Sequence, residues 1–178
     1  MPEDTVRPES EEQECTSSVA SDQQDAPSVL IVFRAGEMHL AIDVRRVREV
    51  ARAIPLSVPL SHAGAVAGMI TLRGESTAVV DVDVLLGVSC MSSDGRARMI
   101  AVHHEGTVVC LRVDQISCLH EVVEAELDPP PAIFADVSVH WLDYVTRTTG
   151  GELIGVVNVG RLLSQVSLAG IEGGAASA

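Results

Sequence analysis

One segment of the chain occurs twice, and this repeat constrains the fold more than any other feature. The first copy, GESTAVVDVDVLL, spans residues 74–86, and the second, GELIGVVNVGRLL, spans residues 151–163. Each copy predicts a hairpin turn, a buried strand and a short helix. Asp81 and Asn158 stand where a helix N-cap is expected, and Gly87 can end the first helix. The Leu-Leu pair is expected to anchor each helix on a sheet.

A second matching pattern precedes each copy of the repeat. Residues 29–43 and residues 98–114 each contain an apolar strand, a glycine turn, a second strand and a final Asp. The pair Glu-Val then follows at 49–50 and at 121–122. Strands this dense, joined by short turns, predict two small barrels or a sandwich. We therefore expect two similar lobes related by a pseudo-twofold axis, with a groove between them; chance repetition of one Val-rich strand is the alternative.

Composition excludes several classes of binding site. Hydrophobic residues make up 47% of the chain but aromatic residues only 2%, so a site that stacks bases on aromatic rings is not expected. The net charge of −13 argues against nucleic acid and against anionic membrane surfaces. The longest uncharged apolar stretch, at 63–72, is far below the roughly 20 residues of a membrane helix, and we expect a cytoplasmic protein.

The two ends of the chain differ from its middle. Residues 1–27 hold eight acidic residues against a single arginine and lack apolar periodicity, so we predict a disordered acidic tail. We expect it to keep the protein soluble, with a binding arm as the alternative. The folded domain is predicted to span residues 28–166, and residues 167–178 are predicted to form a flexible C-terminus.

Groupings of side chains that perform catalysis or hold metals are not evident. His103 and His104 are adjacent, so on a strand they point to opposite faces. His103 and Cys110 are expected to face each other across the Gly106 turn, but two ligands do not make a zinc site. The chain has four cysteines, whose spacing matches no CxxC pair and favours free thiols, at positions 15, 90, 110 and 118. We expect no enzyme activity, no metal and no cofactor.

Arg73 is the residue most open to a binding role. It ends the apolar strand GMITL at 68–72 and directly precedes the Gly74 turn. A half-buried arginine needs a partner, and Glu49 is a candidate. Two interpretations remain open and are compatible: an internal ion pair that fixes the first lobe, and a contact with a partner protein at a groove.

Four segments, in their order along the chain, resemble the CheW family of chemotaxis coupling proteins. They are VLIVFRAGEMHLAIDVRRVREV at 29–50, VAGMITLRGESTAVVDVDVLLG at 66–87, VVCLRVDQISCLHEV at 108–122 and ELIGVVNVGRLL at 152–163. The glycine followed by Leu-Arg-Gly and a Val-Val-Asp strand is the most specific of these.

This resemblance implies a mainly β fold, made of two five-stranded β-barrel lobes with short helices. It also implies a non-enzymatic adaptor that links the regulatory domain of a CheA-type histidine kinase to the cytoplasmic tips of chemoreceptors, recruited to receptor arrays. The positions that match family sites of partner contact are Val47, Glu49, Gly68, Arg73, Gly74 and Leu119. A groove lined by Val47 and Leu119, with Arg73 at its edge, would suit an amphipathic receptor helix.

Two other functions are kept as alternatives. One is a decoy with the same fold that binds receptor but not kinase. The other is a barrel that binds a small molecule or metal around His103 and Cys110. Thr71 stands where the family usually has Asn, and Ala78 where it often has Pro, which bears on partner identity more than on fold.

Overall fold

The computed structural model describes residues 29–59, 64–88, 95–131 and 140–166, which form two sheets. The predicted tails, 1–27 and 167–178, lie outside these residues. The first sheet comprises five strands, β1 (Val29–Ala35), β2 (Met38–Asp43), β9 (Gln115–Glu121), β10 (Leu142–Arg147) and β11 (Leu153–Val157). The second comprises six, β3 (Val47–Arg52), β4 (Val58–Pro59), β5 (Val66–Leu72), β6 (Glu75–Asp81), β7 (Arg98–His104) and β8 (Thr107–Val113).

The strand orders of the two sheets match element by element. The first sheet runs β10-β11-β2-β1-β9, and the second runs β3-β7-β8-β6-β5-β4. When the second order is read backwards and β4 is left out, it becomes β5-β6-β8-β7-β3. Each of these strands is the counterpart, in the other half of the chain, of the strand at the same place in the first sheet. The match extends to direction, because β11 pairs with β2 in parallel and β6 pairs with β8 in parallel. The predicted pair of related lobes is confirmed, with one added two-residue strand, β4.

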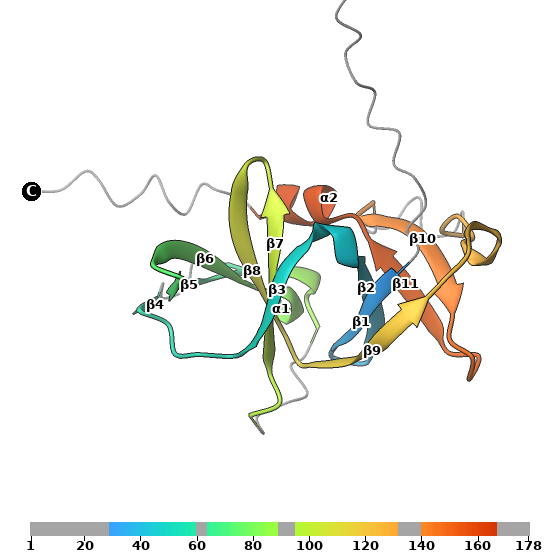
Figure 1. Cartoon of the computed structure of the whole chain (residues 1–178), viewed down its shortest axis with the longest axis horizontal. Coiled ribbons are helices and arrows are strands. Elements are labelled where there is room, and N and C mark those ends of the chain that lie inside the picture. The colour runs from blue at the N-terminus through green and yellow to red at the C-terminus, as the bar shows by residue number, and fades with distance from the viewer. Residues whose placement is uncertain (1–28, 60–63, 89–94, 132–139, 167–178) are drawn as a thin grey trace, which may run out of the picture.

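Each half of the chain contributes strands to both sheets, and the crossing occurs at β3 and β9. β3 follows β2 in sequence but pairs with β7, and β9 follows β8 but pairs with β1. Figure 1 shows β3, in teal, running between the two sheets, with β9 against β1 on the other side. This exchange interleaves the lobes: the first sheet combines strands from residues 29–43 and 115–157, and the second sheet is formed by the continuous stretch 47–113 between them.

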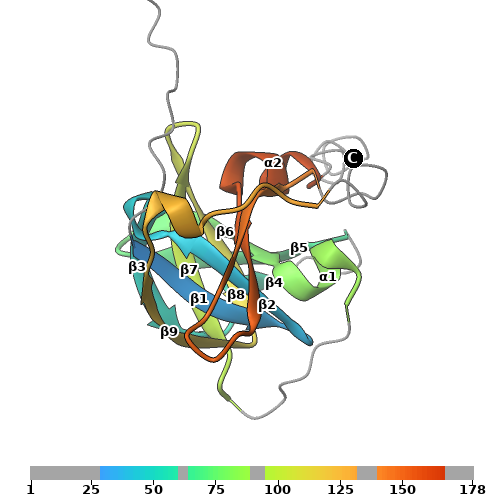
Figure 2. The same cartoon turned by 90° about the vertical axis from the view of Figure 1, so that its right-hand side faces the viewer.

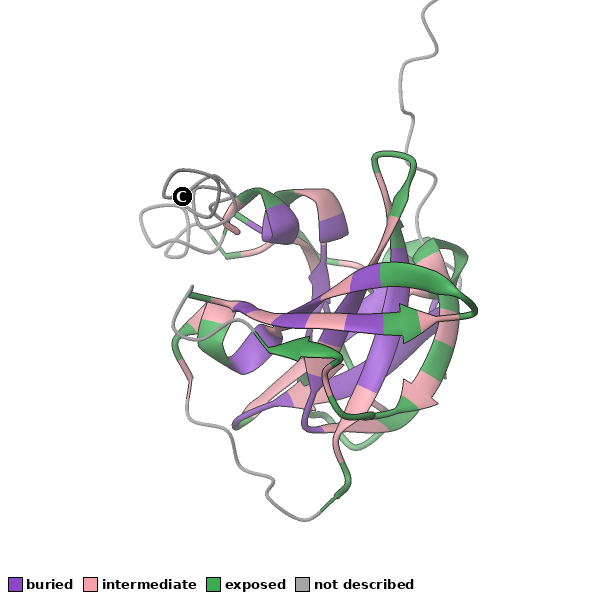
Figure 3. Cartoon of the chain, turned by 90° about the vertical axis from the view of Figure 1, so that its left-hand side faces the viewer, coloured by how far each residue is buried: buried purple, intermediate pink, exposed green. Residues whose placement is uncertain are grey.

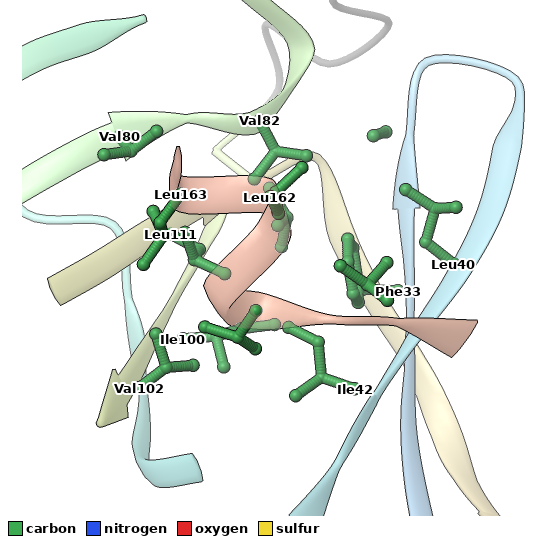
Figure 4. Packing of buried hydrophobic residues seen from close by; sticks show 14 of the residues in the cluster. Phe33, Leu40, Ile42, Val80, Val82, Ile100, Val102, Leu111, Leu162 and Leu163 are labelled. Atoms are coloured by element: carbon green, nitrogen blue, oxygen red, sulfur yellow. The ribbon is translucent and has the colours of Figure 1, made fainter. Parts of the chain in front are cut away.

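Three apolar clusters fill the structure. The largest lies between the sheets, where Phe33 and Ile42 of the first sheet approach Ile100 and Leu111 of the second (Figure 4). Leu162 of the C-terminal helix α2 (Val159–Ser164) completes it. Two smaller clusters lie within the first sheet and the second sheet respectively, and burial alternates along the strands of the second (Figure 3). Valine, leucine and isoleucine therefore supply the core, as the low aromatic content requires.

The helices are short and sit where the repeat predicts them. α1 (Val82–Leu86) follows β6, and α2 follows β11, above the first sheet in Figure 2. Two 3-10 turns are also present, η1 (Val44–Arg46) and η2 (Glu124–Glu126). Among the described residues, no helix is long and apolar enough to span a bilayer.

Of the two predicted N-caps, Asn158 is confirmed and Asp81 is wrong, and Asp43 caps the 3-10 turn η1. Asp43 accepts a hydrogen bond from the Arg45 backbone nitrogen, and Asn158 accepts one from the Arg161 backbone nitrogen. Asp81 occupies the N-cap position of α1, but its side chain makes no cap hydrogen bond. Its carboxylate instead pairs with the guanidinium of Arg112, its register partner on β8, because an ionised two-pronged pair outcompetes a single backbone donor.

Gly68 is required by the close approach of two strands. It lies at a β-bulge in β5, has a φ of +153°, and faces Pro59 of β4. A Cβ at this position would lie 2.3 Å from the backbone oxygen of Val58. Because backbone atoms cannot rotate away as a side chain can, only glycine fits here without moving β4.

We expect Gly68→Ala to lower the free energy of unfolding by about 3 kcal/mol, since overpacking and backbone strain each cost about 1–3 kcal/mol. Gly74→Ala is the matched control, because Gly74 also has a positive φ, +86°, but a Cβ there meets nothing within 4 Å. Urea unfolding of both variants gives the comparison. Equal losses would contradict the steric explanation for Gly68.

Candidate functional site

An ion pair joins two segments of the six-stranded sheet that are far apart in its strand order. Arg73, in the turn between β5 and β6, donates from Nε and Nη2 to Oε2 of Glu49 on β3, at 2.7 Å and 2.5 Å. The hydrogen bond from Arg73 holds the pKa of Glu49 below its usual value, and the charges of Arg73 and Arg48 add to it, while burial opposes the shift. The pair is therefore ionised at neutral pH, and its contribution is lost only as the pH falls through that lowered pKa.

The two partners differ sharply in exposure. The Arg73 side chain is 67% exposed, whereas that of Glu49 is 19% exposed. The prediction of a half-buried Arg73 is therefore wrong, because the carboxylate is the shielded member of the pair. Glu49 fixes a positive charge that stands in solvent at the rim of the lobe.

A second ion pair runs parallel to the first. Arg48 Nη1 lies 3.2 Å from Oε2 of Glu75, so consecutive residues of β3 bind both sides of the β5–β6 turn. β3 is one edge of the six-stranded sheet, and β5 lies next to its other edge. Backbone pairing does not join these edges within the described residues, so the two ion pairs bridge the curled sheet through side chains.

The turn that carries Arg73 has a restricted backbone. Arg73 and Gly74 are its central residues, with φ of 50° and 86°. Positive φ at both central positions is the geometry that two-residue hairpins favour, because its twist matches that of the flanking strands. Arg73 is thus held in a conformation that non-glycine residues seldom adopt.

A small apolar pocket lies directly behind Glu49. Its walls come from β3, β5, β7, β8 and the segment after β3, and its lining residues are Glu49, Ala51, Ile54, Ile70, Leu72, Met99, Ala101 and Cys110. Oε1 of Glu49 is buried and has no hydrogen-bond partner in the described part of the chain. Burial, with a smaller effect of the Glu49 charge, raises the pKa of Cys110 to about 11. The pocket is therefore lined by apolar side chains and the neutral thiol of Cys110, with the Glu49 carboxylate at its edge.

Comparison with known proteins identifies the family. A model of the CheW-like domain matches residues 29–167, which is more than half of the chain. The chain belongs to the CheW family. It is 33% identical over 108 residues to the chemotaxis protein CheW of Rhizobium meliloti, a match that covers 60% of this chain and 69% of that protein. It is also 28% identical over 108 residues to the probable chemotaxis protein CheW of Rhizobium etli, covering 61% and 70%.

A solved structure of the same family has the same fold. The scaffolding protein TtCheW from Thermoanaerobacter tengcongensis superposes with a TM-score of 0.68 at 22% identity, over 77% of this chain and 92% of that one. This agreement supports the two-lobed β architecture described above.

The structure brings together only some of the positions that the CheW resemblance singles out. Glu49, Arg73 and Gly74 form one cluster at the rim of the six-stranded sheet. A β-bulge in β3 separates Val47 from Glu49: Val47 pairs with Val102 and packs on the central core, whereas Glu49 pairs with Ala101 on the pocket side.

Gly68 and Leu119 lie outside this cluster. Gly68 serves the β4–β5 contact. Leu119 lies on β9, an edge strand of the other sheet, with 67% of its surface exposed.

The expected contact between His103 and Cys110 is not formed. Cys110 is buried opposite Ala101, whereas His103 is exposed opposite Val108, two pairs further along the hairpin. Cys110 and Cys118 carry free thiols, and Cys15 and Cys90 lie outside the described residues. No group of three His, Cys, Asp or Glu side chains that could hold a metal occurs in the described ranges.

Sequence reasoning missed the Arg48–Glu75 pair and the pocket. The sequence did contain a signal for the Arg48–Glu75 ion pair, since Glu75 directly follows the Arg73-Gly74 turn and Arg48 directly precedes Glu49. The pocket had none, because its lining residues come from four strands and a loop whose register only the fold defines.

We expect Cys110 to react with iodoacetamide far more slowly than Cys118, which is exposed on β9. A pKa of about 11 instead of 9.0 reduces the thiolate fraction at pH 8 about a hundredfold, and burial slows access further. Peptide mapping by mass spectrometry gives both rates in one sample, and urea should equalise them. Equal rates in the native protein would contradict a closed pocket.

The raised pKa of Cys110 also predicts that the free energy of unfolding falls as the pH rises from about 9 to about 11.

Proposed function

We propose that this chain is a non-enzymatic adaptor that couples chemoreceptors to a CheA-type histidine kinase. Family membership supports the proposal, together with the names of the relatives, two of which are chemotaxis proteins and one a scaffolding protein. In this role the chain acts in the cytoplasm, recruited to receptor arrays at the membrane. It contacts the regulatory domain of the kinase with one surface and the receptor tip with another.

The observation that carries the proposal is the exposed guanidinium of Arg73. Its side chain is anchored at one end by Glu49 and by the turn backbone, yet it remains 67% exposed. An arginine held in this way loses little conformational freedom when a partner binds, and it presents further donors to carboxylate or backbone oxygens. Arginine is also a frequent anchor of protein interfaces.

Apolar surface on both sheets complements this charge. Val50 on β3 is 44% exposed and Leu119 on β9 is 67% exposed, so the edge strands that the two halves exchange both present apolar side chains. A receptor tip formed by amphipathic helices fits apolar side chains flanked by a fixed charge. Because the exchanged strands tie both lobes together, a partner on one lobe is rigidly connected to a partner on the other.

Regulation in this scheme requires differential binding. The receptor shifts the kinase between states only if its contacts with the adaptor differ between receptor conformations. A guanidinium at a fixed position provides such a contact, since a small movement of the receptor helix makes or breaks a hydrogen bond of strict geometry.

We expect Arg73→Ala to fold but to lose receptor control of kinase activity in a reconstituted array, with binding weakened about tenfold or more, as for truncation of an interface anchor. Arg147→Ala is the matched control, because Arg147 is exposed on β10 of the other sheet and, among the described residues, donates only to the backbone oxygen of Gly151.

Kinase and receptor are also tested separately for binding to the unaltered chain. Full receptor-controlled kinase activity with Arg73→Ala would refute the role of Arg73. Binding to receptor without any binding to kinase would identify a decoy instead of an adaptor.

A further inference from the structure

Three arginines flank β3 at its two ends and are here called the basic edge: Arg46 ends η1 just before β3, and Arg52 ends β3 opposite Arg98 of β7. Arg46 and Arg52 are exposed and Arg98 is partly exposed. Within the described ranges no carboxylate pairs with any of the three, whereas Arg45, Arg48 and Arg73 have acidic partners. The Arg98 guanidinium donates instead to the backbone oxygens of Arg96 and Ala97.

The position of Arg52 and Arg98 makes this strip unusual. The two residues are register partners on neighbouring strands, so two side chains of like charge start from directly opposite backbone positions. Like-charge cross-strand pairs destabilise a sheet unless an anion neutralises them. In a protein of net charge −13, such a pair indicates a surface that binds an acidic segment.

The chain carries an acidic segment of its own that starts beside the Arg46 end of this strip. Residues 1–27 contain eight acidic residues and one arginine. The first described residue, Val29, opens β1, and the next one, Leu30, pairs with Asp43 immediately before η1, which ends at Arg46. The acidic segment therefore leaves the first sheet next to Arg46, whereas Arg52 and Arg98 lie on the second sheet, at the other end of β3.

The available chain length covers the whole basic edge. An extended chain spans roughly 3.3–3.6 Å per residue, so Asp22 and Asp25 reach about 13–25 Å from Val29. β3, six residues long, spans about 20 Å between the two ends of the strip. The acidic residues at positions 9–14 reach its far end with chain to spare.

We propose that the acidic N-terminal segment, residues 1–27, docks in cis on the basic edge formed by Arg46, Arg52 and Arg98. The contact consists of exposed ion pairs that are individually weak and strongly screened by salt. The docked segment lies beside Arg48 and Glu49 and competes with any acidic partner for the same arginines. The proposal goes beyond the adaptor function and does not depend on it.

The test uses the full-length chain with a nitroxide spin label on its native Cys15. Cys90→Ser and Cys118→Ser remove two other thiols, and the buried Cys110 is left in place. Amide signals of residues 44–52 and 97–98 are recorded by NMR with the label oxidised and reduced. At about 0.01 M salt, where screening extends over roughly 30 Å, we expect selective loss of these signals, and recovery at about 1 M salt, where it extends over about 3 Å.

Two comparisons make the result specific. The variant with Arg46→Gln, Arg52→Gln and Arg98→Gln should keep its signals at low salt, whereas the control Arg147→Gln should lose them as the unaltered chain does. The reduced spectrum of each variant reports whether it is folded.

Three outcomes would overturn the proposal. They are no signal loss at low salt, equal loss along β10 and β11, and loss that persists in the triple variant. Loss seen only when a spin-labelled chain broadens a second, isotope-labelled chain would assign the contact to another copy and would also overturn docking in cis.

Discussion

The six-stranded lobe depends on closing a sheet whose edge strands do not pair with each other through the described backbone. β3 and β5 approach from opposite ends of the strand order, and the Glu49–Arg73 and Arg48–Glu75 pairs span the gap. The first of these pairs also borders the pocket, because Glu49 is one of the residues that line it, together with Leu72, Met99 and Cys110. The Glu49–Arg73 pair also determines which group faces solvent, since the Glu49 carboxylate is shielded and the Arg73 guanidinium is exposed.

This arrangement gives one interaction a structural and a functional consequence. A carboxylate that is largely removed from water needs its cation, and losing the cation leaves an uncompensated charge. The cation, by contrast, has donors to spare and a backbone held by a two-residue turn. The strand exchange then connects this rim to the opposite lobe, because β3 and β9 each belong to one half of the chain by sequence and to the other by pairing. A scaffold that must transmit a contact from one partner to another benefits from that interleaving.

Much of the fold could be predicted from the sequence because the repeat carries it. Gly-Glu turns, Val-Val strands and Leu-Leu helices at 74–86 and 151–163 specify local structure through backbone preference and burial, which do not depend on distant contacts. The cap at Asp81 failed for the opposite reason: its partner Arg112 lies on a parallel neighbour strand, and only the tertiary register brings them together.

The site was predicted in part for the same reasons. The Arg73–Glu49 pairing was accessible because an arginine at the end of an apolar strand needs an acidic partner, and Glu49 was a candidate. The sequence did not show which of the two partners, Glu49 or Arg73, is shielded from solvent, because exposure depends on how the sheet curls. Nor did it show the separation of Val47 from Glu49, because a β-bulge reverses the facing of residues that simple alternation would place together.

The central claim is that Arg73 contacts a partner while Glu49 only positions it. The most direct test is receptor-controlled kinase activity of the charge-reversed double variant, Glu49→Arg with Arg73→Glu, in a reconstituted array. The reversal rebuilds the ion pair and should restore thermal stability relative to either single variant. Control of the kinase is expected to stay lost, because the exposed charge is now negative. Recovery of control together with stability would contradict it and would reduce Arg73 to an internal strut.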